Sequence, residues 1–284
     1  MDLILKNLTQ KDIILDPVPH LDIKNAFPEE IVNGMLNELP DKSFLEDVYK
    51  INSKNNPSAI ELSINDLRSY NLDTPYLSKF IKAHSSPSFK KSLFNLFGDH
   101  LKFFLPLFKP ELVEPVETSL FINPIKTNVS DINKDDSIFI RGPHLDDAVD
   151  VIVFLYYLKP EETVIKGGSL DLYKYKSRFK GFRRDIWWDE RELHFKHIEK
   201  VKSIPYENNR FIILLDNINA IHGVTPIFSG SKGYRYRLSG GLSTPSNYRH
   251  YNYRDSLNPL EVVADSVGLK YQKLRRKIHK HLKF

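Results

Sequence analysis

Residues 116–240 are divided into short β-branched and aromatic segments by glycine, proline and asparagine. Strands this short, at this spacing, are typical of antiparallel sheets packed face to face. We therefore predict a two-sheet antiparallel barrel of the jelly-roll kind over residues 115–242. Its eight candidate strands are Glu117–Ile125, Ser137–Arg141, Asp150–Leu158, Gly168–Tyr175, Arg191–Lys196 with its flanks, Arg210–Asn217, Ala220–Pro226 and Tyr234–Leu238.

The first third of the chain has helical patterns. Pro17–Ile23 predicts a short first strand, and Asn25–Glu30 opens a helix, because proline and glutamate suit a first turn. Further helices are predicted over Thr74–His84 and Phe89–Leu105, and residues 51–58 are predicted to be a polar loop.

The end of the chain is basic. Residues 245–258 are predicted to form a polar loop, and a helix is predicted from Pro259 to the C-terminus. We expect one α+β domain over residues 1–284: an N-terminal helical layer with the first strand (1–114), the jelly-roll core (115–242), and a loop with a basic C-terminal helix (243–284).

Composition excludes several classes of protein. The chain has no cysteine, so disulfides, thiolate zinc sites and cysteine nucleophiles are excluded. The start of the chain shows no secretory signal, and no apolar run approaches the ~20 residues of a membrane span. We expect a cytoplasmic protein without a membrane span.

The net charge of +5 is unevenly distributed. Residues 270–284 hold seven basic side chains and no acidic one, so the rest of the chain carries −2. The charge of the main body therefore does not indicate a nucleic-acid partner, and nothing in the sequence indicates an oligomeric state.

A possible metal-binding triplet precedes the apolar segment 151–158. His144 and Asp146 are two residues apart, and in an extended chain such residues point to the same side. A loop hydrogen bond would also explain the pair. Two histidines and one carboxylate form the facial site that holds ferrous iron, and His222 is our candidate for the third ligand.

Five motifs in order resemble the Fe(II)- and 2-oxoglutarate-dependent oxygenases with a double-stranded β-helix, specifically the prolyl-4-hydroxylase-like branch. They are His144-x-Asp146, Gly167–Tyr173, Pro205–Leu214, His222–Pro226 and Gly233–Gly240. The resemblance implies a cupin-like barrel in which His144, Asp146 and His222 hold Fe(II). It also implies that 2-oxoglutarate and O2 are consumed, that succinate and CO2 are released, and that ascorbate can serve as a reductant. Because Asp146 is present, hydroxylation is favoured over halogenation.

In this family an arginine on the last strand binds 2-oxoglutarate, and two arginines compete for that role. Arg235 better matches the family's sequence around that arginine, whereas Arg237 begins an Arg-x-Ser pair found in other branches. Arg235 follows His222 by 13 residues, a longer spacing than this branch implies, which predicts a small insertion around Ser229–Ser231. Arg235 is favoured, but either arginine could serve.

Basic and aromatic residues suggest where a substrate binds. Arg141 could hold 2-oxoglutarate or an anionic substrate, or anchor its loop. Arg183 and Trp187 belong to a predicted insertion at the barrel mouth, where they could contact a sugar or a phosphate; buried tryptophans are an equal alternative. We therefore expect a small-molecule substrate of anionic or sugar-like character.

Other functions fit the same fold. The chain could be a non-catalytic jelly-roll module that binds a sugar or nucleic acid, a peptidyl-prolyl hydroxylase, or a cupin-like isomerase with a different metal. Metal content and affinity for 2-oxoglutarate distinguish these alternatives.

Overall fold

The computed structural model describes residues 2–52, 59–70, 72–104, 109–125, 137–138, 141–147, 149–176, 193, 195–217 and 219–245. Its helices are α1 (Glu29–Asn37), α2 (Lys42–Asn52), α3 (Ile64–Ser69), α4 (Pro75–His84) and α5 (Pro87–Phe104). Its strands are β1 (His20–Lys24), β2 (Ile60–Leu62), β3 (Glu114–Pro124), β4 (Ser137–Ile138), β5 (Asp150–Leu158), β6 (Leu170–Tyr175), β7 (Ile198–Ile204), β8 (Arg210–Leu215), β9 (His222–Val224), β10 (Ile227–Phe228) and β11 (Tyr234–Ser243).

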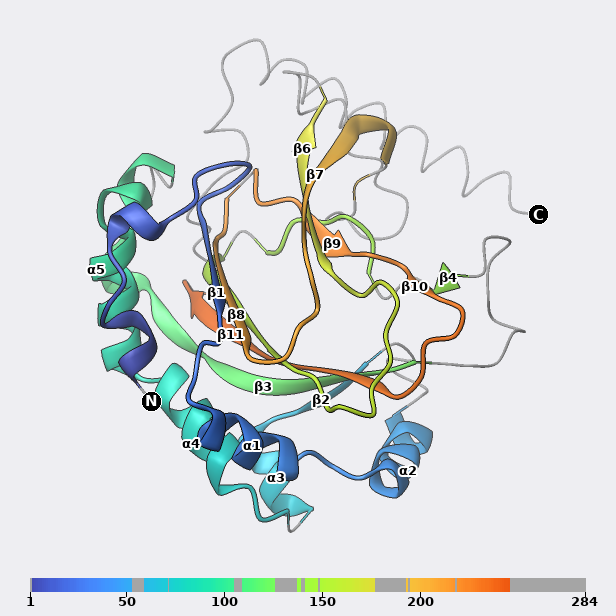
Figure 1. Ribbon diagram of the computed structural model, residues 1–284. Helices are drawn as coiled ribbons and strands as arrows, with labels where there is room; N and C mark the ends of the chain where they lie inside the picture. Colours follow the sequence, from blue (N-terminus) through green and yellow to red (C-terminus); the bar gives the residue numbers. More distant parts are fainter. Residues whose placement is uncertain are drawn as a thin grey trace, which may run out of the picture.

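Each strand pair in the described part of the chain is antiparallel. The strands and helices together form a mixed α/β structure. Six strands make one sheet in the order β1-β8-β5-β11-β3-β2, β7-β6-β9 form a second sheet, and β10-β4 form a third pair. Helices α1, α4 and α5 lie along one side of the six-stranded sheet, and β6, β7 and β9 lie on the other (Figure 1).

Strand β5 shows how alternation builds these layers. Phe154 and Tyr156 point toward the helices and share one core cluster with Phe80 of α4. The intervening Tyr157 points the other way and packs with Leu172 of β6. Each fully buried apolar side chain of this kind contributes about 1.5–3 kcal/mol, so the two faces of the sheet hold the layers together.

Proline sets the start of three helices. Pro28 precedes α1, while Pro75 and Pro87 are the first residues of α4 and α5. A proline lacks the N–H that a helix start would leave unpaired, and its φ is already helical. Helix α5 kinks at Gly98 (φ 41°), where a Cβ atom would overlap the side chain of Gln10.

The predicted strand at Arg191–Lys196 is wrong for the described residues of that range. Residues Phe195–His197 form a 3₁₀ turn, and the strand is β7, which starts at Ile198. Its sequence is rich in charge, but it pairs with β6 along its whole length. Only its end residues, Ile198 and Ile204, are buried, so pairing makes this segment a strand more than intrinsic preference does.

The region between α1 and α4 contains elements that the sequence patterns did not predict. Helix α2 buries Leu45 and Val48, which are one turn apart, and it takes up Ile51 and Asn52 of the predicted polar loop. Helix α3 begins with a capping box, because Ser63 and Asp66 bond each other's backbone N–H. The predicted C-terminal helix lies outside the described residues, among which no helix is long and apolar enough to cross a membrane.

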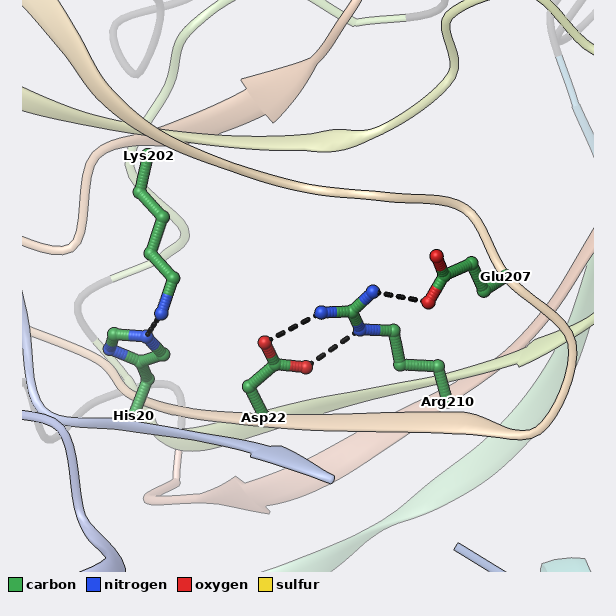
Figure 2. A network of polar contacts seen from close by, with 5 residues as sticks. All are labelled: His20, Asp22, Lys202, Glu207 and Arg210. Carbon is green, nitrogen blue, oxygen red and sulfur yellow. Dashed lines mark hydrogen bonds and ion pairs between the residues drawn. The ribbon is translucent and has the colours of Figure 1, made fainter. Parts of the chain in front are cut away.

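A part-buried group of polar contacts lies where the edges of the two larger sheets meet (Figure 2). Arg210 of β8 donates from Nε and Nη2 to the two oxygens of Asp22 on β1, each at 2.7 Å, and from Nη1 to Glu207 at 2.6 Å. His20 Nδ1 donates to the Val18 carbonyl, so its Nε2 can accept from Lys202 Nζ at 2.8 Å. Because Lys202 belongs to β7, this contact ties the three-stranded sheet to β1.

We expect Arg210→Met to lower the free energy of unfolding by about 1–3 kcal/mol, because it leaves the part-buried Asp22 carboxylate without its bidentate partner. The matched control is Lys42→Met, which breaks the exposed Lys42–Glu46 pair and should cost only about 0.3–0.5 kcal/mol. Denaturant unfolding of both variants measures the difference. Equal losses would show that the Arg210 network does not stabilise the fold.

Candidate metal centre

Two backbone hydrogen bonds bring the predicted ligands together. The His144 N–H donates to the His222 carbonyl at 2.8 Å, and the His222 N–H donates to the His144 carbonyl at 3.0 Å. The two imidazole rings therefore lie side by side, with centroids 4.3 Å apart. Strand β9 carries His222 and is itself fixed by pairing with β6, so the sheet positions both histidines.

Gly223 makes this close pairing possible. A Cβ atom at this position would lie 3.1 Å from backbone atoms of Gly142 and Pro143. That distance is shorter than an ordinary van der Waals contact. The glycine after His222 therefore lets the segment that carries His144 approach β9.

The orientation of both rings is set by backbone carbonyls. His144 Nδ1 donates to Gly142 O at 2.8 Å, and His222 Nδ1 donates to Ala220 O at 2.9 Å. Each bond fixes the tautomer and leaves Nε2 with a free lone pair, as in many metal-binding histidines.

Asp146 faces both of these Nε2 atoms. Its Oδ1 lies 3.6 Å from His144 Nε2, and its Oδ2 lies 3.4 Å from His222 Nε2. One ligand atom from each of the three residues lies within 4.8 Å of the others, so the group could hold a metal ion. The predicted triad is thus brought to one point.

The protonation of this group suits a metal. Burial, together with the neighbouring His222, lowers the pKa of His144 to about 4. Burial alone would raise the pKa of Asp146, but the adjacent imidazoles outweigh it and hold that pKa well below its usual range. At neutral pH the site therefore offers a neutral His144 and a carboxylate. Two imidazoles and one carboxylate on one side of an ion are typical of non-haem Fe(II) sites with open positions.

Arg235 is a buried cation with an unpaired nitrogen. It is 1% exposed, donates from Nε to Gly168 O at 3.0 Å, and donates from Nη2 to the Tyr157 hydroxyl at 3.1 Å. Its guanidinium also lies over the ring of Tyr206. Nη1 has no hydrogen-bond partner among the described residues. A buried guanidinium nitrogen without a partner is costly, so this geometry fits a bound carboxylate.

Arg237 lies two residues further along β11 in different surroundings. It is half-buried, donates from Nη1 to Asn123 Oδ1 at 2.9 Å, and lies 4.5 Å from the ring of Phe121. Burial and the nearby Arg235 lower its pKa to about 9, so it remains a cation at neutral pH.

The other predicted substrate residues are only partly accounted for. Arg141 is half-buried; its carbonyl accepts from the Val224 N–H at 3.0 Å, and its charge helps lower the pKa of Asp146. Arg183 and Trp187 lie outside the described residues.

Tyr157 and Asn123 were not predicted as site residues, although both contact the arginines. The sequence signal for Tyr157 was a tyrosine within an apolar strand segment, because a buried hydroxyl needs a hydrogen-bond partner.

Comparisons with known proteins give structural matches only. No family model and no curated protein matches the sequence. A prolyl 4-hydroxylase from Phytophthora capsici is 16% identical, with 97% of this chain and 72% of that chain covered and a TM-score of 0.41. A putative oxygenase from Shewanella oneidensis is 13% identical, with 85% and 87% covered and a TM-score of 0.48. HygX from Streptomyces hygroscopicus, solved with nickel and 2-oxoglutarate bound, is 11% identical, with 82% and 85% covered and a TM-score of 0.36.

Each of the three TM-scores is below 0.5, so the case for a particular chemistry rests on the residues of the site.

Proposed function

We propose that the protein is an Fe(II)- and 2-oxoglutarate-dependent oxygenase of the prolyl-4-hydroxylase-like branch, in which the sheets form a double-stranded β-helix. The observation that carries the proposal is the His144–Asp146–His222 group on the same chain as a buried arginine with an unpaired nitrogen. The substrate is a small molecule with an unactivated C–H bond. The reaction converts this bond, O2 and 2-oxoglutarate into C–OH, succinate and CO2.

In this proposal His144, Asp146 and His222 hold the iron. When bound, iron supplies the redox chemistry that couples oxidation of 2-oxoglutarate to oxidation of the substrate. These three side chains would hold the ion and would leave coordination positions for the co-substrate and O2. The Nδ1–H bonds to Gly142 and Ala220 keep both Nε2 atoms aimed at the ion.

Arg235 binds the distal carboxylate of 2-oxoglutarate in this scheme. Nη1 is its free donor, and the Tyr157 hydroxyl, which accepts from Nη2, can donate its own proton to the same carboxylate. Because Arg235 and Tyr157 are buried, the charge-assisted bonds would be stronger than at the surface. Arg237 is not needed for this contact.

We expect His144→Ala, Asp146→Ala and His222→Ala each to weaken Fe(II) binding by roughly 100-fold or more, since even loss of outer contacts costs 10–100-fold. Anaerobic metal titration measures the affinity. Asp147→Ala is the matched control, because it removes a carboxylate next to Asp146 in the sequence that is not part of the group. This variant should bind Fe(II) like the wild type. A wild-type protein that binds no divalent ion would favour the non-catalytic binding module.

We expect the purified protein with Fe(II), ascorbate and 2-oxoglutarate to release succinate slowly without substrate, and His144→Ala to abolish this release. Arg235→Gln should raise the Kd for 2-oxoglutarate by about 100-fold, because loss of one partner of a buried charge pair costs about 2–5 kcal/mol. Lys232→Gln removes the same charge from an exposed position. It should leave the rate of succinate release and the Kd for 2-oxoglutarate unchanged. Iron binding without 2-oxoglutarate affinity would favour the cupin-like isomerase.

A further inference from the structure

Arg235 and Arg237, the two arginines of β11, differ in the side chains and backbone groups that contact them. Arg210 on β8 is an example of an arginine whose charge is neutralised within the fold, because it forms ion pairs with Asp22 and Glu207. Arg237 has no ion pair with any described acidic side chain. Its described contacts are a neutral amide and an aromatic ring, those of Asn123 and Phe121. Such contacts fix the direction of a guanidinium and leave its charge available.

Phe121 and Asn123, the two residues that contact the Arg237 guanidinium, both lie on β3 of the six-stranded sheet. Phe121 lies directly opposite Arg237 in the pairing of β3 with β11, and Asn123 lies opposite Arg235. Asn123 is 2% exposed, so it is fixed, whereas Arg237 is half-buried and accessible. The guanidinium is therefore held before any ligand arrives, which reduces the entropy lost on binding.

Arg237 lies closer than Arg235 to the metal end of the sheet. Strand β11 runs antiparallel to β5, and its last residue, Ser243, pairs with Asp150. The Asp150 N–H donates to the Asp147 carbonyl at 2.8 Å, so the start of β5 adjoins the segment that carries Asp146. Two residues along a strand span about 7 Å. Arg237 is thus one such step nearer the reacting end.

The charges near Arg237 leave an excess of positive charge. Burial lowers the pKa of Arg237 most, Arg235 and Arg141 lower it further, and Tyr157 and Asp146 raise it. In the proposed complex, Asp146 and the first carboxylate of 2-oxoglutarate offset the two charges of Fe(II), and the distal carboxylate offsets Arg235. Arg237 and Arg141 then have no counter-charge among the described residues, and in a partly desolvated site an unpaired charge is costly.

We propose that Arg237, held by Asn123 and Phe121, binds an anionic oxygen group of the substrate, a carboxylate or a phosphate. This inference rests on the proposed function, and it separates the two arginines: Arg235 belongs to the co-substrate and Arg237 to the substrate. Arg141 adds a second positive charge to the same region, so neutral analogues of the substrate bind poorly.

Paired probes test the inference on the Fe(II)-loaded full chain. Amino acids are compared with their amides, and hexose phosphates with free hexoses, by the increase in succinate release over the rate without substrate. We expect either the amino acids or the hexose phosphates to stimulate succinate release, and their neutral counterparts not to do so. Stimulation by amino acids would indicate a carboxylate, and stimulation by hexose phosphates would indicate a phosphate.

Variants then assign the effect to Arg237. Arg237→Gln should raise the KM for the stimulating anion by about tenfold or more and leave the Kd for 2-oxoglutarate within about twofold. Arg237→Lys should restore part of the affinity, because it keeps the charge and loses the planar fork. Lys232→Gln, which removes an exposed cation elsewhere, should behave like the wild type.

The outcomes separate this inference from the proposed function. If neutral probes stimulate as well as anionic ones, or if Arg237→Gln weakens 2-oxoglutarate binding as Arg235→Gln does, the inference is overturned and the oxygenase assignment stands. If the wild type releases no succinate under any condition, the proposed function itself fails.

Discussion

The candidate site depends on the reciprocal pair of hydrogen bonds between the backbones of His144 and His222. These bonds fix two segments that lie far apart in the sequence, and they set both imidazoles at a separation that one ion can bridge. Gly223 supplies the space, and the carbonyls of Gly142 and Ala220 supply the ring orientation. No single side chain determines this geometry, because the backbone positions each ring and also fixes its tautomer.

The same logic explains why the polar residues of the six-stranded sheet lie where they do. Strands β5 and β11 pair with each other and are covered on both faces, by helices on one side and by the three-stranded sheet on the other. A polar side chain in such a strand must find a partner. Tyr157 and Arg235 bond each other, and among the described residues Nη1 of Arg235 is left without a partner. That remaining donor makes the pair suited to a ligand.

Local pattern predicted some of this structure and missed other parts for physical reasons. Strand β5 was predicted with its observed ends, because its apolar run is bounded by polar residues. The placement of His144 and Asp146 on one side was expected from their two-residue spacing, although in the structure this segment has only an isolated bridge at His144. Strand β7 was misplaced because its charged sequence becomes a strand only through pairing with β6. The contact of Asn123 with Arg237 was not predictable, since it depends on the register between β3 and β11.

Three arginines of the chain illustrate how partners distinguish structural from functional charge. Arg210 is paired with two carboxylates, so its charge is used within the fold. Arg235 is held by a carbonyl and a phenol, and Arg237 by an amide and a phenyl ring. Neutral partners satisfy hydrogen bonds without cancelling charge, so the latter two guanidiniums keep their electrostatic attraction for an anion. Two such cations two residues apart on one strand repel each other, and in our proposal that repulsion is relieved when each binds its own anion.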